Sequence, residues 1–154
     1  MILYLILHNI RSVHNVGSIF RTADAAGVTK LYLTGYTPTP LDRFGRPRKD
    51  MAKVALGAER TVPWERYASA AQVLRILRKQ GVHLVAVEQA KDAIDYRKVK
   101  ARSAIAFLLG NETSGLPKAL QRLCDTVTEI PMHGKKESLN VSVAAGIILF
   151  TTRK

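Results

Sequence analysis

The stretch FLLGNETSGLP, from Phe107 to Pro117, decides the fold expected for this sequence. It begins inside a run from Ala104 to Leu109 that is apolar at every position, which is typical of a strand buried on both faces. The chain then turns at Gly110, so residues 111–113 lie at the carboxyl end of that strand, where parallel sheets collect their ligands. Pro117 suits the start of a helix. The stretch therefore predicts a strand-turn-helix corner beside a binding site.

The same apolar character marks three further runs, Ile2–Leu7, Lys30–Thr34 and His83–Val87. Between these runs, apolar residues recur at helical spacing over 15–26, with Asn15 as the expected cap and Gly27 as the stop. Residues 67–80 repeat the helical pattern and end at Gly81. Alternating buried strands and amphipathic helices predict an α/β fold, with a mainly parallel sheet and helices on both faces.

The C-terminal part is expected to hold a last short strand over 127–130, a loop over 131–137 and a helix over 141–152, capped by Asn140 or Ser138. This helix is apolar on nearly every side, which a surface helix of a monomer does not tolerate. The pattern favours a self-association face. A central core helix is the alternative.

Composition bounds the class of protein. A chain of 154 residues with 47% hydrophobic content fits one domain, with no separate RNA-binding domain expected. Lys and Arg number 24 against 12 Asp and Glu, giving a net charge of +12, so a polyanion such as RNA or DNA is the first candidate partner. The apolar runs are far shorter than the ~20 residues of a membrane span, and no signal peptide is expected.

Cysteine and histidine usage argues against a structural metal. The single cysteine, Cys124, has no partner for a disulfide or a zinc site, and the four histidines are scattered along the chain. A reducing cytoplasm fits this usage. The sequence also lacks G-x-G-x-x-G, the P-loop, H-E-x-x-H and G-x-S-x-G, so an ordinary dinucleotide enzyme, NTPase, zinc hydrolase or serine hydrolase is not expected.

A long basic segment interrupts the alternation. Residues 35–53 are rich in proline and glycine and carry Arg43, Arg46, Arg48, Lys49 and Lys53. Long loops in compact domains are usually functional or disordered, and phosphate contacts supply most sequence-independent affinity for nucleic acids. We expect this loop to bind RNA, helped by Arg97, Lys98, Lys100 and Arg102. A merely solvated charged loop is the alternative.

Three segments together resemble one known family. They are NIRSVHNVGSIFRT from Asn9 to Thr22, FLLGNETSGLP from Phe107 to Pro117, and EIPMHGKKESLNVSVAA from Glu129 to Ala145. In order and separation they resemble the motifs of the SpoU (TrmH) family of SPOUT methyltransferases, and the resemblance covers essentially the whole chain.

That resemblance implies one SPOUT domain over residues 1–154, with a deep C-terminal trefoil knot and an obligate homodimer. It also implies that the knot loops bind S-adenosylmethionine and that the enzyme methylates a ribose 2′-hydroxyl of RNA. Periodicity alone would not suggest a knot, because knots are essentially absent from protein folds.

The matching positions supply candidate site residues. The resemblance implies a catalytic set of Asn15, Arg21, Glu112, Ser138 and Asn140. For the cofactor it implies Leu109, Gly110, Asn111, Gly115, Ile130, Pro131, Met132, Ser138, Leu139 and Asn140, among which Ile130, Met132 and Leu139 are natural walls for an adenine ring. Without the resemblance, Asn15 reads equally as a helix cap, and Glu112 as a solvated loop acid.

Arg21 is the candidate on the RNA side. With about 100° of turn per residue, it projects away from the apolar face of its helix. A guanidinium is normally a donor only, so we expect Arg21 to clamp the phosphate beside the target ribose. The group that accepts the hydroxyl proton stays open among Arg21, Glu112 and that phosphate, as does whether Arg21 serves its own subunit or the partner.

Two alternatives accompany this interpretation. One is a knotted dimer that binds RNA without catalysis. The other keeps the chemistry and changes the target RNA. Because no flanking RNA-binding extension is expected, the sequence favours tRNA over rRNA, and the anticodon loop is one candidate site.

Overall fold

A central sheet organises the chain, and the computed structural model describes residues 1–153. Within these residues the sheet has seven strands in the order β3-β2-β1-β6-β4-β7-β5, and every neighbouring pair is parallel. The strands are β1 (Ile2–His8), β2 (Lys30–Thr34), β3 (Trp64–Tyr67), β4 (His83–Val87), β5 (Ile94–Asp95), β6 (Ala104–Leu109) and β7 (Thr126–Glu129). The parallel α/β prediction is confirmed.

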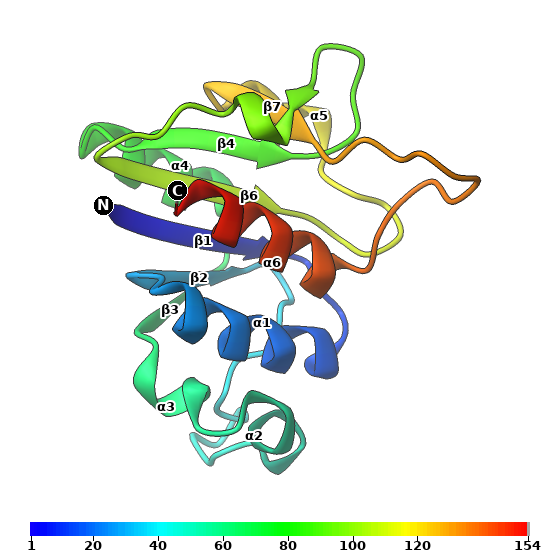
Figure 1. Cartoon of the computed structure of the whole chain (residues 1–154). Helices are drawn as coiled ribbons and strands as arrows, with labels where there is room; N and C mark the ends of the chain where they lie inside the picture. The colour runs from blue at the N-terminus through cyan, green and yellow to red at the C-terminus, as the bar shows by residue number, and fades with distance from the viewer. Residues whose placement is uncertain (154) are drawn as a thin grey trace.

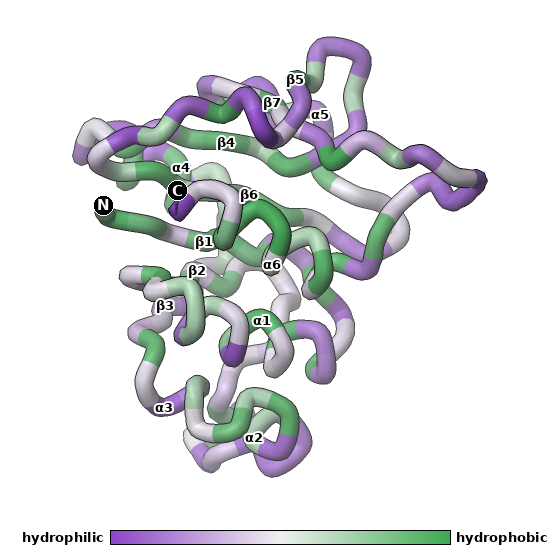
Figure 2. Tube along the Cα trace, in the orientation of Figure 1, coloured by the Kyte–Doolittle hydropathy of each residue, from purple (hydrophilic) through white to green (hydrophobic). Residues whose placement is uncertain are grey.

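Helices cover both faces of the sheet, as expected (Figure 1). One face carries α1 (Val13–Ala26) and α6 (Val141–Thr152), with α2 (Lys49–Ala55) and α3 (Ala58–Thr61) beyond α1. The other face carries α4 (Ala70–Lys79) and α5 (Lys118–Arg122), and a short 3₁₀ turn spans Tyr96–Lys98. Figure 2 shows the apolar character concentrated along the central strands, which are buried between the two helical layers, and along α6, one side of which packs against the core.

The start of α1 corrects one expectation. Ser12 caps this helix, and its hydroxyl accepts a 3.0 Å hydrogen bond from the backbone N–H of Asn15. Asn15 is therefore inside the first turn rather than at the cap, so its side chain is free for other partners. The end of α1 is as predicted, since Gly27 adopts a φ of 71°, which glycine tolerates without strain.

Three further segments differ from the predictions. Residues 67–80 do not form one helix, because β3 ends at Tyr67 and α4 begins after Ser69, whose hydroxyl accepts from Gln72. The basic segment is shorter than predicted, because α2 begins at Lys49. The two-residue strand β5 has no periodic signal and exists only through its pairing with β7.

The last helix matches its predicted range and divides its apolar surface between two environments. Asn140 caps α6 and accepts from the backbone N–H of Ser142. Ala145, Ile148 and Leu149 are buried against the core, whereas Val143 and Phe150 are 49% and 53% exposed. The core alternative thus describes one side of α6, and the other side is left uncovered. No helix within residues 1–153 is long and apolar enough to cross a membrane.

Candidate active site

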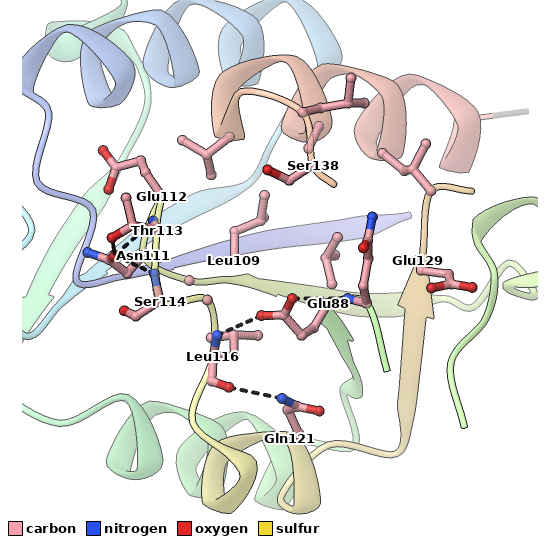
Figure 3. A pocket seen from close by; sticks show the side chains of 18 of the residues that line it. Glu88, Leu109, Asn111, Glu112, Thr113, Ser114, Leu116, Gln121, Glu129 and Ser138 are labelled. Carbon is pink, nitrogen blue, oxygen red and sulfur yellow. Dashed lines mark hydrogen bonds between the residues drawn. The ribbon is translucent and has the colours of Figure 1, made fainter. Parts of the chain in front are cut away.

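A cavity of about 390 Å³ opens at the carboxyl ends of β4, β6 and β7 (Figure 3). Its volume falls in the range of small-ligand sites. The lining residues are Val87–Gln89, Leu109–Leu116, Lys118, Gln121, Glu129, Ile130, Met132, Ser138, Leu139, Val141 and Ala144. The cavity therefore joins the second and third motifs, which lie at the ends of β6 and β7 on either side of β4. Among the expected cofactor residues, Pro131 and Asn140 are not part of its wall.

Two glycines shape the floor of the cavity. The loop after β6 folds back so that the N–H of Gly115 donates to the carbonyl of Asn111 over 3.0 Å. A Cβ on Gly110 would lie 2.6 Å from the carbonyl oxygen of Gly115, and Gly115 itself has a φ of 69°. Both positions thus exclude larger residues, and the loop holds one compact conformation.

Hydrogen bonds of the Asn111 side chain stabilise this loop. Its side chain is nearly buried, and its Oδ1 accepts from the backbone N–H groups of Thr113 and Ser114 at 3.0 and 2.9 Å. Its Nδ2 donates to the carbonyl of Asn9 and to the hydroxyl of Tyr36, both at 2.8 Å. These bonds occupy the amide, so Asn111 contributes to the site by positioning the loop.

Glu112 binds the N-terminus of α1. Its carboxylate accepts from the backbone N–H groups of Arg11 and Ser12 at 3.0 and 3.1 Å, and from the side-chain amide of Asn15 at 3.2 Å. Burial alone would raise the pKa of Glu112, but these hydrogen bonds outweigh it and the pKa is lowered. Glu112 is therefore ionised at neutral pH and is a weak base.

Asn15 links all three motifs. Its Nδ2 donates to Glu112, and its Oδ1 accepts from the Nδ2 of Asn140 over 3.2 Å. The first motif is thereby connected to the turn after β6 and to the cap of α6. The structure thus brings together four of the five expected catalytic residues, since Ser138 lines the adjacent cavity wall.

Glu88 is a cavity residue that the sequence analysis missed. It directly follows β4, its Oε2 accepts from the backbone N–H of Leu116 over 2.7 Å, and its Oε1 accepts from Gln89 over 3.0 Å. A Cβ on Gly115 would lie 2.2 Å from Oε2, so that glycine makes room for the carboxylate. A signal was available in the sequence, because Glu88 directly follows the buried run His83–Val87, at the end of a strand where parallel sheets collect their ligands.

Arg21 lies elsewhere, in a second, more open hollow of about 690 Å³ between α1, α2 and α6. The hollow is also lined by His14, Lys53 and the exposed apolar residues Val143 and Phe150. The structure therefore does not bring Arg21 into the wall of the cavity within one chain.

Three of the other basic candidates form ion pairs with nearby carboxylates. Arg46 pairs with Asp42 at 3.1 Å, Arg48 with Asp50 at 2.9 Å, and Arg97 with Asp95. Exposed ion pairs contribute little to stability, so these guanidinium groups can exchange a carboxylate for a phosphate at small cost. None of the five basic residues expected at 43–53 lines the cavity, and Lys53 alone lines the Arg21 hollow.

The fold and the cavity identify the class of protein. Residues 2–150 match the SpoU rRNA Methylase family, and the chain belongs to this family. It is 35% identical over 152 residues to the 23S rRNA (guanosine-2′-O-)-methyltransferase RlmB of Neisseria meningitidis, which covers 99% of this chain and 58% of that protein. The resemblance stated from the sequence is thereby confirmed.

Solved structures agree with this assignment. An AdoMet-bound rRNA methyltransferase from Sinorhizobium meliloti superposes with a TM-score of 0.88 at 35% identity, covering 99% of this chain and 56% of that one. A second structure, described as giving insight into 2-OH methylation of C/U34 on tRNA, has a TM-score of 0.84 at 26% identity and covers 99% and 94%. The chain thus spans little more than half the length of the rRNA relatives.

Proposed function

We propose that this chain transfers the methyl group of S-adenosylmethionine to a ribose 2′-hydroxyl of RNA. The observation that carries the proposal is the cavity, in which the second and third family motifs meet at the carboxyl ends of β6 and β7, the two parallel strands that flank β4. Membership of the family supports RNA methylation as the reaction, and the AdoMet-bound relative supports S-adenosylmethionine as the methyl donor.

The lining residues fit the proposed cofactor. Ile130, Met132 and Leu139 offer an apolar surface for the adenine, and the Gly110 backbone can approach closely because no side chain intervenes. We assign Glu88 to the ribose hydroxyls, since carboxylates at strand ends bind such groups. When bound, the cofactor supplies an electrophilic methyl group. Pro131 and Asn140, which lie outside the wall, would shape and anchor the loop that carries Leu139.

We further propose a homodimer that buries the uncovered side of α6. Val143 and Phe150 lie beside Arg21, so a symmetric contact there would place Arg21 near the partner subunit. Arg21 would then clamp a substrate phosphate at the partner's cavity. This arrangement explains why the cavity and Arg21 lie apart within one chain.

The C-terminal trefoil knot and a single domain over residues 1–154 belong to the same proposal, as does a cytoplasmic location.

The methyl transfer is an in-line displacement, in which the protein aligns the two reactants and the 2′-hydroxyl loses a proton. The lowered pKa of Glu112 and its three hydrogen bonds argue against Glu112 as the acceptor. Its role is to hold α1 and Asn15 in place. The proton acceptor is thereby narrowed to the substrate phosphate or Arg21.

Ribosomal RNA is the proposed substrate. The preference for tRNA made from the sequence is not supported by the curated relatives, whose names specify 23S rRNA. Transfer RNA is a second candidate for one reason, namely that the structure described for tRNA methylation matches this chain over 94% of its own length.

Incubation of the protein with S-adenosylmethionine and either rRNA or tRNA from cells lacking its gene tests the proposal. Nuclease digestion and mass spectrometry should find a new 2′-O-methylnucleoside in the rRNA. Methylation of tRNA alone would establish the second candidate. Binding of RNA without binding of S-adenosylmethionine in calorimetry would instead establish the non-catalytic alternative and overturn the proposal.

A further inference from the structure

Residues 41–47 form a small closed hairpin at the tip of the basic segment. An antiparallel bridge joins Leu41 to Pro47, and the N–H of Asp42 donates to the carbonyl of Arg46 over 2.8 Å. The carboxylate of Asp42 accepts from the backbone N–H groups of Phe44 and Arg46 at 2.8 and 2.9 Å, and from Arg46 Nε at 3.1 Å. The hairpin is therefore ordered before any partner binds.

Phe44 lies at the tip of this hairpin and is 66% exposed, the highest value among the exposed large hydrophobic side chains within residues 1–153. The guanidinium carbons of Arg43 and Arg46 lie 4.8 and 5.0 Å from its ring centroid. Both arginines are themselves exposed. The hairpin thus presents one aromatic ring and two planar cations together.

We propose that the 41–47 hairpin is a stacking platform for an unpaired base of the RNA, with Phe44 receiving the base and Arg43 and Arg46 binding the adjoining phosphates. This inference rests on the proposed function for the RNA itself. Unpaired bases stack on aromatic rings and on guanidinium planes, whereas a regular duplex offers no free base face. The preformed turn limits the entropy lost on binding.

The position of the hairpin agrees with this role. It leads through Arg48 directly into α2, and Lys53 of α2 lines the hollow that contains Arg21. In Figure 1 this part of the chain lies at the end of the molecule opposite β7 and α5, beyond α1. An RNA strand held at Arg21 can therefore continue along α2 to Phe44.

Binding of two probes separates stacking from charge. One is an oligoadenylate of about ten nucleotides, and the other is an abasic ribose-phosphate of equal length. The unmodified protein should prefer the oligoadenylate by roughly tenfold or more. Phe44→Leu should remove most of this preference, and Phe44→Trp should retain it. Arg43→Gln should weaken binding of both probes alike, because it contacts phosphate.

Leu41→Ala is the matched control, since Leu41 is a second exposed apolar residue of the same hairpin. It should leave the preference unchanged. Equal binding of the two probes by the unmodified protein, or an unchanged preference in Phe44→Leu, would overturn the platform. So would a change in oligomeric state in Phe44→Leu, because Phe44 would then be a protein contact. A stacking preference without methyl transfer would instead contradict the proposed function alone.

Discussion

The side-chain amide of Asn15 donates a 3.2 Å hydrogen bond to the carboxylate of Glu112, across 97 residues of sequence. The same carboxylate accepts hydrogen bonds from the backbone N–H groups of Arg11 and Ser12, which precede the first turn of α1. A negative charge at a helix N-terminus is stabilising. Glu112 therefore connects the turn beside the cavity to the helix that carries Arg21.

Glu112→Gln should destabilise the fold by about 1–3 kcal/mol, because an amide cannot satisfy all the donors that now face the carboxylate. The pKa of Glu112 is lowered from 4.5, so its contribution is present above that pH and is lost as the pH falls through the lower folded pKa. Urea unfolding across this range measures both effects. Glu137→Gln, at an exposed position, is the control, and a penalty that stays constant with falling pH would contradict the role.

Arg21→Ala should lower kcat/KM by about 100-fold or more while leaving the affinity for S-adenosylhomocysteine unchanged, because Arg21 lies outside the cavity wall. Steady-state kinetics and calorimetry measure the two quantities separately. Arg75→Ala provides the comparison, since Arg75 is exposed on α4 at the opposite face of the sheet. Parallel losses of activity and cofactor binding would refute the assignment.

Glu88 should distinguish ribose from deoxyribose in the cofactor. Calorimetry should show that S-adenosylhomocysteine binds roughly tenfold more tightly than its 2′-deoxy analogue, and Glu88→Gln should reduce this ratio. The glutamine keeps an oxygen for the N–H of Leu116, so the loop should persist. Glu129→Gln changes another acid of the cavity wall. If that variant lost the preference instead, the assignment to Glu88 would be wrong.

Phe150→Asp should convert the proposed dimer to monomers. The new carboxylate would replace a half-exposed ring, and burying it in the interface without an opposite charge is costly. Sedimentation velocity reports the oligomeric state, and circular dichroism checks that the fold survives. Ile76→Asp, on the partly exposed side of α4, serves as the control and should leave the dimer intact. A Phe150→Asp protein with an unchanged sedimentation coefficient would rule out this face.

Mixing two inactive variants should restore methylation if Arg21 serves the partner subunit. One variant is Arg21→Ala, and the other is Gly110→Ala, whose new Cβ would collide with the carbonyl of Gly115 and close the cavity floor. A heterodimer then contains one intact cavity facing one intact arginine. Refolding the two proteins together and measuring methyl transfer tests this, and an inactive mixture would show that Arg21 acts within its own chain.

Local patterns were sufficient for the central strands and for α6. Their apolar runs and capping residues, such as Asn140, predict a strand or a helix from neighbouring residues alone. The patterns failed at β3 and β5, whose short segments become strands only by pairing with β2 and β7. They failed again at Asn15, because a cap and a first-turn residue differ by only a few positions and Ser12 competes for the role.

By itself, the sequence determined the alternation of buried strands and helices, the three motifs and the excess of positive charge. These properties depend on neighbouring residues or on composition. Only the tertiary structure decided that Glu112 serves α1, that Glu88 joins the cavity and that Arg21 lies apart from it. The physical reason is that hydrogen bonds and burial depend on distances in space. FLLGNETSGLP predicted where the site lies, and the folded chain determined which side chains face it.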